Sequence, residues 1–184
     1  LVGPLLAFTS LSRGAEAVSS AEESFEGRLE KAVKQLADYD FGGSLTLLEP
    51  LTDLTAAVHG KTEERRQLAA ALAAVLGSSA PRGAKQFACR QLATIGTEEV
   101  VPALAAILPD ESSSHMARYA LERIPGPAAD EALRRAVGTV QGKLRVGMIN
   151  SLGNRRSQAA VDDLSRLLGD KDVDVACASA AALG

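Results

Sequence analysis

Apolar side chains recur every three or four residues along most of this chain, which is the spacing of one face of an α-helix. In the stretch 87–95 the apolar positions at this spacing are Phe87, Cys89, Leu92 and Ile95. Gly96 follows where a helix commonly ends, and Thr97 with two glutamates stands where a second helix would be capped. The pattern therefore predicts two successive helices joined by a tight turn.

The same pair of helices is repeated further along the chain, as marked by two series of leucines. The anchor leucines of the first helices are Leu92, Leu121 and Leu152, and those of the second helices are Leu104, Leu133 and Leu164. In both series the leucines are separated by 29 and then 31 residues. Because one helix pair cannot cover its own apolar face, the pairs are predicted to stack around one continuous core.

This period divides the second half of the chain into repeats, with the bounds 81–110, 111–138 and 139–170, followed by a partial repeat 171–184. Asp110 and Asp170 take the same position in two of these units. Residues 18–80 are also predicted to be helical, although their apolar faces are spaced less regularly. We interpret 18–80 as an N-terminal cap region, since a stacked array needs a terminal unit that shields its first repeat.

A short motif recurs at 88–92, 117–121, 148–153 and 179–184. It begins with a small or apolar residue and has a leucine four positions later, which is followed by glycine in two of the four copies. With a short helix behind each copy, the pattern resembles HEAT-like repeats, in particular the short bacterial type named after phycobilisome lyases. The resemblance covers 81–184 and implies an all-α fold, namely a right-handed α-solenoid of stacked antiparallel helix pairs, like the HEAT and armadillo superhelices. It also implies that the second helices line the concave surface.

In this family an arginine often stands seven residues before the anchor leucine and pairs with an acid between repeats. The corresponding positions here hold Lys85, Ser114, Arg145 and Ala176. Since Arg145 alone keeps the residue type, a full ladder of Arg–Asp pairs is not expected.

Composition supports the helical interpretation. The 184 residues include 33 alanines and 25 leucines, the types that favour helix, while aromatic residues make up 3%. An apolar fraction of 46% excludes intrinsic disorder of the whole chain. The formal net charge of −3 disfavours a nucleic-acid binder that relies on bulk positive charge.

Residues 1–17 differ from the rest. An apolar run over 1–11 precedes Ala15 and Ala17, the spacing of small residues that a signal peptidase recognises, and the run is too short to span a bilayer. We predict a truncated signal peptide, export to the periplasm or cell exterior, and a mature chain from Val18 without a membrane span. The alternative is an apolar helix docked on the core of a cytoplasmic protein. The missing initiator methionine and the partial last repeat indicate a fragment.

Candidate chemistry is sparse. Cys89 and Cys177 lie 88 residues apart in the sequence. Both are interpreted as buried free thiols in helices, where they act as small apolar residues. His59 and His115 stand apart from any cysteine or carboxylate cluster with metal-ligand spacing, and no nucleophile or phosphate-binding motif occurs. The sequence therefore predicts no catalytic residue, no metal and no cofactor.

The remaining candidate is a ridge of arginines on the repeats. Its members are Arg134, Arg135, Arg155 and Arg156. Acidic residues interleave with them, which dilutes the positive field, and aromatic partners for bases are scarce. We expect Arg155→Glu to leave folding intact and to weaken the binding of any acidic partner.

These observations predict a non-catalytic segment that binds proteins or serves as a scaffold, with partners of unknown identity. Two alternatives stay open. The segment could be an accessory module of a larger enzyme or electron-transfer protein, lyase-like or haem-containing, whose catalytic part lies elsewhere. It could also be a nucleic-acid-binding helical repeat, which the charge balance disfavours.

Overall fold

The computed structural model describes residues 24–184, and this part of the chain is entirely helical. The α-helices are Phe25–Ala37 (α1), Glu49–Ala57 (α2), Thr62–Gly77 (α3), Arg82–Ile95 (α4), Val101–Ala106 (α5), Ser114–Leu121 (α6), Pro127–Thr139 (α7), Gly142–Asn154 (α8), Val161–Leu167 (α9) and Val173–Leu183 (α10). Three short 3₁₀ helices cover Leu45–Leu47 (η1), Glu98–Val100 (η2) and Gln158–Ala160 (η3). The all-α prediction is confirmed, and the predicted signal segment 1–17 lies outside the described residues.

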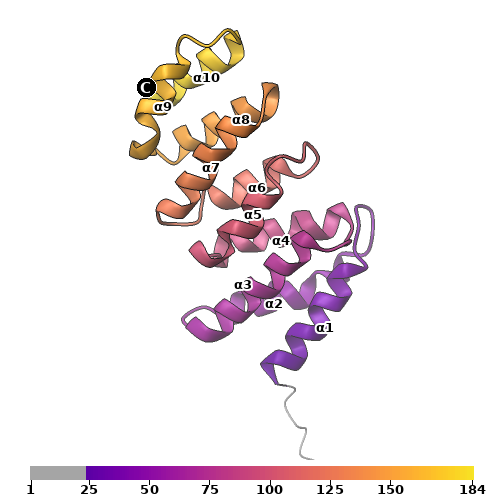
Figure 1. The fold of residues 1–184 in the computed structure, drawn as a ribbon. Coiled ribbons are helices and arrows are strands. Elements are labelled where there is room, and N and C mark those ends of the chain that lie inside the picture. The colour runs from indigo at the N-terminus through magenta and orange to yellow at the C-terminus, as the bar shows by residue number, and fades with distance from the viewer. Residues whose placement is uncertain (1–23) are drawn as a thin grey trace, which may run out of the picture.

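The helices form an elongated stack that runs from α1 at one end to α10 at the other (Figure 1). Successive helices from α3 onward lie alternately in two rows. In one row α4 contacts α6, α6 contacts α8 and α8 contacts α10. In the other row α3 contacts α5, α5 contacts α7 and α7 contacts η3, which leads into α9. Each helix therefore meets its neighbours in its own row and in the facing row.

The core lies between the two rows. All six anchor leucines are buried there, from Leu92 with none of its side chain exposed to Leu164 with 2% exposed. Ala88, Ala117 and Ala120 are also completely buried, so the helices approach one another closely. The scarcity of large rings follows, because closely packed helices leave little room between them.

Acidic side chains of one unit cap the start of a later helix. Asp40 accepts a hydrogen bond from the backbone N–H of Gly83 at 2.9 Å, at the beginning of α4. Glu98 accepts one from the N–H of Ala128 at 3.1 Å, at the beginning of α7. Such carboxylates satisfy N–H groups that the helix itself leaves unpaired. Thr97, predicted to cap its own helix, makes no such side-chain bond.

The N-terminal section is joined to the first repeat by a close backbone contact. A Cβ atom added to Gly83 would lie 2.9 Å from the Asp40 Cα and from the Phe41 nitrogen. Neither atom belongs to a flexible side chain, so the contact requires glycine.

We therefore expect Gly83→Ala to lower the free energy of unfolding by about 1–3 kcal/mol, the usual cost of overpacking. Gly77→Ala in α3 is the matched control, because a Cβ there would meet nothing within 4 Å. Chemical denaturation of both variants tests this. Equal midpoints for the two would show that the loop after α1 moves away from α4 without cost.

Among residues 24–184, none of the helices combines the length and the apolar character that crossing a bilayer requires.

Candidate interaction face

Arg155, a member of the predicted ridge, has its side chain enclosed in the stack and does not point into solvent. Its guanidinium donates to the backbone carbonyls of Leu121 at 2.6 Å, Ile124 at 2.7 Å and Gly126 at 2.8 Å. It also pairs with Asp130 at 2.6 Å, and 8% of its side chain is exposed. These contacts contradict the interpretation of Arg155 as a ridge cation open to a partner, and they argue against the expectation that Arg155→Glu leaves folding intact, because this arginine closes the turn between α6 and α7.

The other three ridge arginines are held in different ways. Arg134 lies between Glu131 at 3.2 Å and Asp163 at 2.7 Å, and the hydrogen bond to Asp163 raises the pKa of its guanidinium. Arg135 pairs with Glu131 at 2.8 Å but stays largely exposed. Arg156 is exposed and adopts a left-handed backbone conformation with φ of 52°. The structure brings Arg134 and Arg135 together on α7, but no continuous band of unpaired cations results.

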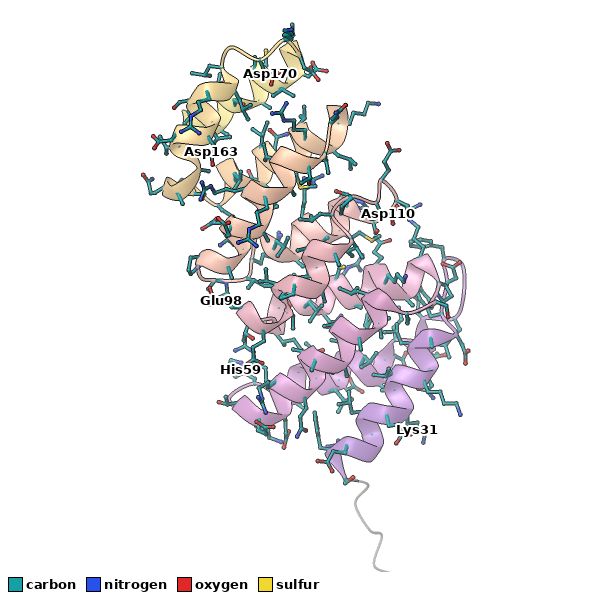
Figure 2. All side chains as sticks on the ribbon, viewed as in Figure 1. Lys31, His59, Glu98, Asp110, Asp163 and Asp170 are labelled. Carbon is teal, nitrogen blue, oxygen red and sulfur yellow. The ribbon has the colours of Figure 1, made fainter. Side chains whose placement is uncertain are left out.

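Of the four positions at which the resemblance to HEAT-like repeats places an arginine, the one held by Arg145 forms an ion pair. Its guanidinium contacts Asp170 at 3.0 Å, between α8 and the turn before α10. Asp110 holds the corresponding place before α6 (Figure 2), and hydrogen bonds from Ser113 and Ser112, together with the nearby Lys85, lower the pKa of its carboxyl group. Both acids accept the N–H of the residue two positions later, at 3.0 Å in each case. The same position thus has the same local structure two repeats apart.

Charge is distributed unevenly between the two rows of helices, apart from α5, which has no charged residue, and α10, which carries Asp174. The helices α4, α6 and α8 contain no acidic residue, and their basic residues are Arg82, Lys85, Arg90, Arg118, Lys143 and Arg145. The facing helices α3, α7 and α9 carry two acids each, mixed with arginines. We call α4, α6 and α8 the acid-free row. An anionic partner therefore meets attraction along this row and mixed charge on the other.

Two of the basic residues in the acid-free row serve the fold itself. Arg118 donates to the Gly147 carbonyl at 3.1 Å and to the Ser151 hydroxyl at 3.2 Å, which ties α6 to α8. Burial lowers the pKa of Arg118. Arg145 is engaged by Asp170. Arg90 and Lys143 are exposed, and no ion pair joins either to the residues that the structure describes.

A groove of about 320 Å³ opens on this row between α4 and α6. The residues that line it are Gln86, Cys89, Arg90, His115, Met116 and Tyr119. Tyr119 is 42% exposed, and the guanidinium of Arg123 stacks 3.6 Å from the centre of its ring. Arg123 also donates to the Tyr119 carbonyl at 2.9 Å, which fixes the stack. Tyrosine and arginine are the residue types most enriched among those that dominate binding energy in protein interfaces.

The acid next to Arg123 in the sequence is engaged elsewhere. Glu122 accepts hydrogen bonds from the Ser151 hydroxyl at 2.6 Å and from the Asn154 amide at 3.3 Å, both on α8. It forms no ion pair with Arg123 within the described residues. The guanidinium groups of Arg90 and Arg123 are therefore available to a partner.

Sequence reasoning missed this face, although its signal is present in the sequence. The most visible cations in the sequence are the adjacent pairs of arginines, and these pairs fall in the helix 127–139 and in the turn after residue 154. The alternative signal was the absence of acids from the helices 82–95, 114–121 and 142–154, and it becomes meaningful once those helices are known to lie side by side.

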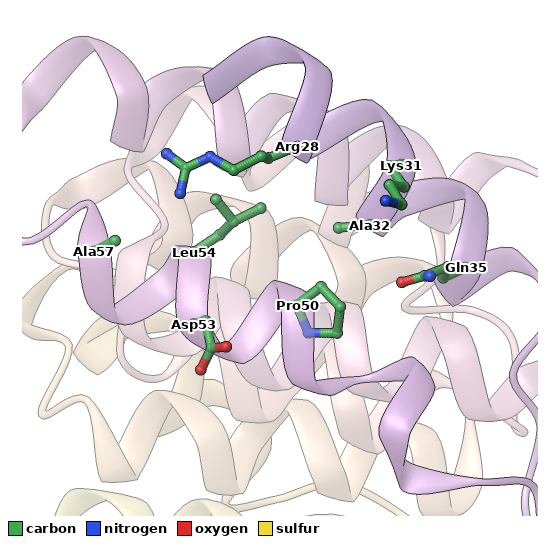
Figure 3. Close-up of a pocket in the computed structure, with 8 residues that line it drawn as sticks. All are labelled: Arg28, Lys31, Ala32, Gln35, Pro50, Asp53, Leu54 and Ala57. Atoms are coloured by element: carbon green, nitrogen blue, oxygen red, sulfur yellow. The ribbon is translucent and has the colours of Figure 1, made fainter. Parts of the chain in front are cut away.

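The further grooves on the stack include two with mixed charge. One of about 450 Å³ separates α5 from α7, and its lining includes Pro102, Leu108, Ala132 and Arg135. The other, of about 430 Å³, lies between α1 and α2, and Figure 3 shows residues that line it, among them Arg28 and Lys31 of α1 and Asp53 and Leu54 of α2. Both combine cations with an acid, so neither has the single sign of charge found along the acid-free row.

The two thiols differ in exposure. Cys89 is 1% exposed, and burial raises the pKa of its thiol to about 12, so almost no reactive thiolate forms at neutral pH. Cys177 is exposed on α10, which corrects its interpretation as a buried apolar residue, and both cysteines are free thiols.

Titration of the native protein with dithiodipyridine is therefore expected to give one fast thiol, and Cys177→Ser is expected to remove it. The Cys89 thiol is expected to react after denaturation. Two fast thiols in the native protein would show that α4 and α6 separate enough to admit the reagent to the Cys89 thiol at the bottom of the groove between them.

Metal-ligating side chains are not gathered in the part of the chain that the structure describes. Residues 24–184 contain no group of three or more His, Cys, Asp or Glu side chains placed to hold an ion. His59 and His115 are both exposed. The predicted absence of metal and cofactor stays a prediction.

No protein-family model matches this chain, and no curated protein matches it either. The resemblance to HEAT-like repeats therefore stays a prediction from the sequence pattern.

Proposed function

We propose that this chain is a non-catalytic segment that binds other proteins, or serves as a scaffold for them, through stacked HEAT-like helix pairs. In this proposal residues 81–184 form a right-handed α-solenoid, and residues 18–80 cap its first repeat. The alternation of helices between two rows and the burial of all six anchor leucines support it. A stack of this kind offers a long surface on which one partner contacts several units.

The acid-free row is the surface on which we place the partner, and this observation carries the proposal. Three adjacent helices with basic and no acidic residues, together with an exposed Tyr119 beneath Arg123, have the composition of an interface rather than of a solvated surface. This places binding on the first helices of the repeats. The resemblance to HEAT-like repeats instead favours the second helices.

Site-specific photo-crosslinking tests this placement. A photo-reactive benzophenone amino acid at His115, which lines the α4–α6 groove, is expected to capture a partner in cells of the source organism. The same amino acid at Arg135, which is exposed on α7 of the other row, is the matched control. Capture from position 135 and none from position 115 would contradict the proposal, as would equal capture from both.

Nucleic-acid binding is the second candidate, because the same row of cations suits phosphates. The net charge of −3 and the guanidinium that already covers one face of the Tyr119 ring argue against it. We expect no change in the anisotropy of labelled single- or double-stranded DNA or RNA at low salt. Salt-sensitive binding that Arg90→Glu abolishes would establish this candidate in place of the first.

We also propose export, with residues 1–17 as a signal segment. Sequencing the N-terminus of the protein recovered from its cells is expected to give a chain that starts near Val18 and lies outside the cytoplasm. Recovery of residues 1–17 in a cytoplasmic fraction would contradict this proposal and leave the interaction face unaffected.

A further inference from the structure

We infer that the groove between α4 and α6 binds an acidic polypeptide segment that inserts one apolar side chain between flanking carboxylates. This inference rests on the proposed function, since it names the class of partner that the same face binds. The partner is a protein segment, and the test below distinguishes it from a nucleic acid.

The floor of the groove is apolar. Met116 is 3% exposed, and Cys89 is held as a neutral thiol, so both present apolar surface at the bottom of a depression of about 320 Å³. A volume of this size accommodates a side chain such as leucine or methionine. Phosphate groups gain nothing from an apolar floor, whereas burying an apolar side chain is favourable.

The rim of the groove is cationic and contains no acid. Arg90 of α4 lines the groove, and Arg123 stacks on Tyr119, a lining residue of α6. Neither forms an ion pair within residues 24–184, and the nearest acid in the sequence, Glu122, is bound by Ser151 and Asn154 of α8. Guanidinium groups recognise carboxylates through paired hydrogen bonds, so carboxylates on either side of the apolar residue complement this rim.

The Tyr119–Arg123 stack favours a peptide over a nucleic acid. The guanidinium lies 3.6 Å from the ring centre, so that face of the ring is closed to a stacking base. Tyr119 is nevertheless 42% exposed, and a tyrosine hydroxyl group suits backbone or side-chain hydrogen bonds of a peptide. The stack also holds Arg123 in place, which reduces the entropy lost when a carboxylate binds.

The test uses the full chain and fluorescein-labelled peptides in anisotropy titrations at low and high salt. The first peptide carries a central leucine between runs of glutamate, the second replaces the leucine by serine, and the third replaces every glutamate by glutamine. We expect saturable binding of the first peptide, about tenfold weaker binding of the second, and loss of binding with the third, because the apolar contact and the charges act together.

Matched charge reversals locate the site. The double variant Arg90→Glu with Arg123→Glu is expected to abolish binding of the first peptide. The double variant Arg66→Glu with Arg135→Glu makes the same change in net charge on the other row, where both side chains are exposed, and is expected to keep binding within about twofold. Circular dichroism of each variant confirms that the helices persist, so a lost fold is not mistaken for a lost site.

The outcomes separate this inference from the proposed function. Capture of a protein through position 115 with no binding of any acidic peptide would overturn the inference and leave the proposed function standing. Equal binding of the leucine and serine peptides would show that the groove does not bind an apolar side chain. Tighter binding of single-stranded DNA than of the first peptide, at the same residues, would overturn the protein partner.

Discussion

Arg155→Glu is expected to destabilise the fold by about 3–5 kcal/mol, the usual cost of breaking a buried, hydrogen-bonded charge pair. The wild-type guanidinium binds three backbone carbonyls at the turn between α6 and α7 and pairs with Asp130. A glutamate would place a second carboxylate against Asp130 and against carbonyl oxygens that then lack a donor. Urea denaturation followed by circular dichroism measures the effect.

Arg156→Glu is the matched control, because the adjacent side chain is exposed and lies in no ion pair among the described residues. It is expected to change the free energy of unfolding by less than about 0.5 kcal/mol, as surface substitutions usually do. Arg155→Lys is expected to fall between the two, since an ammonium group cannot reach all the same acceptors. Equal stability of Arg155→Glu and Arg156→Glu would mean that the turn does not depend on this arginine.

Leu121→Ala is expected to lower the free energy of unfolding by about 2–5 kcal/mol, because it leaves a cavity between helices that cannot close fully. Leu121 has no exposed surface and stands at the end of α6, where both rows of the stack meet. Thermal unfolding measures the effect, and the midpoint is expected to fall by several degrees.

Leu168→Ala removes the same atoms from a residue that is 48% exposed at the end of α9, which makes it a suitable control. It is expected to cost less than about 1 kcal/mol, because less area is removed from contact with the core. Similar losses for the two leucines would show that the period of 29 to 31 residues does not mark the core positions.

The repeated core was predictable from the sequence because the packing of neighbouring helices depends on the spacing of apolar residues along each helix. Leu92, Leu121 and Leu152 are buried at the spacing that marked them, and Asp110 and Asp170 adopt the same local hydrogen bonding. Each of these features is set by residues within one helix pair and its neighbour. Arg145 likewise forms an ion pair with Asp170, the kind of pair that the resemblance to HEAT-like repeats predicts for an arginine at this position.

The candidate site was not predictable in the same way, because it depends on which helices lie side by side. Arg155 had the appearance of a surface arginine, yet its partners lie 25 to 34 residues earlier in the chain. The acid-free row extends over three helices that are separated in sequence by α5 and α7. A charge count along the chain averages the two rows together, so segregation of charge appears only in three dimensions.

Amide hydrogen exchange of the full chain, with and without the partner captured through position 115, tests the central claim most directly. The account predicts added protection in α4, α6 and α8, with unchanged exchange in α3, α5 and α7. Protection confined to the α5–α7 groove, or to the groove between α1 and α2, would contradict it and move the interaction face away from the acid-free row.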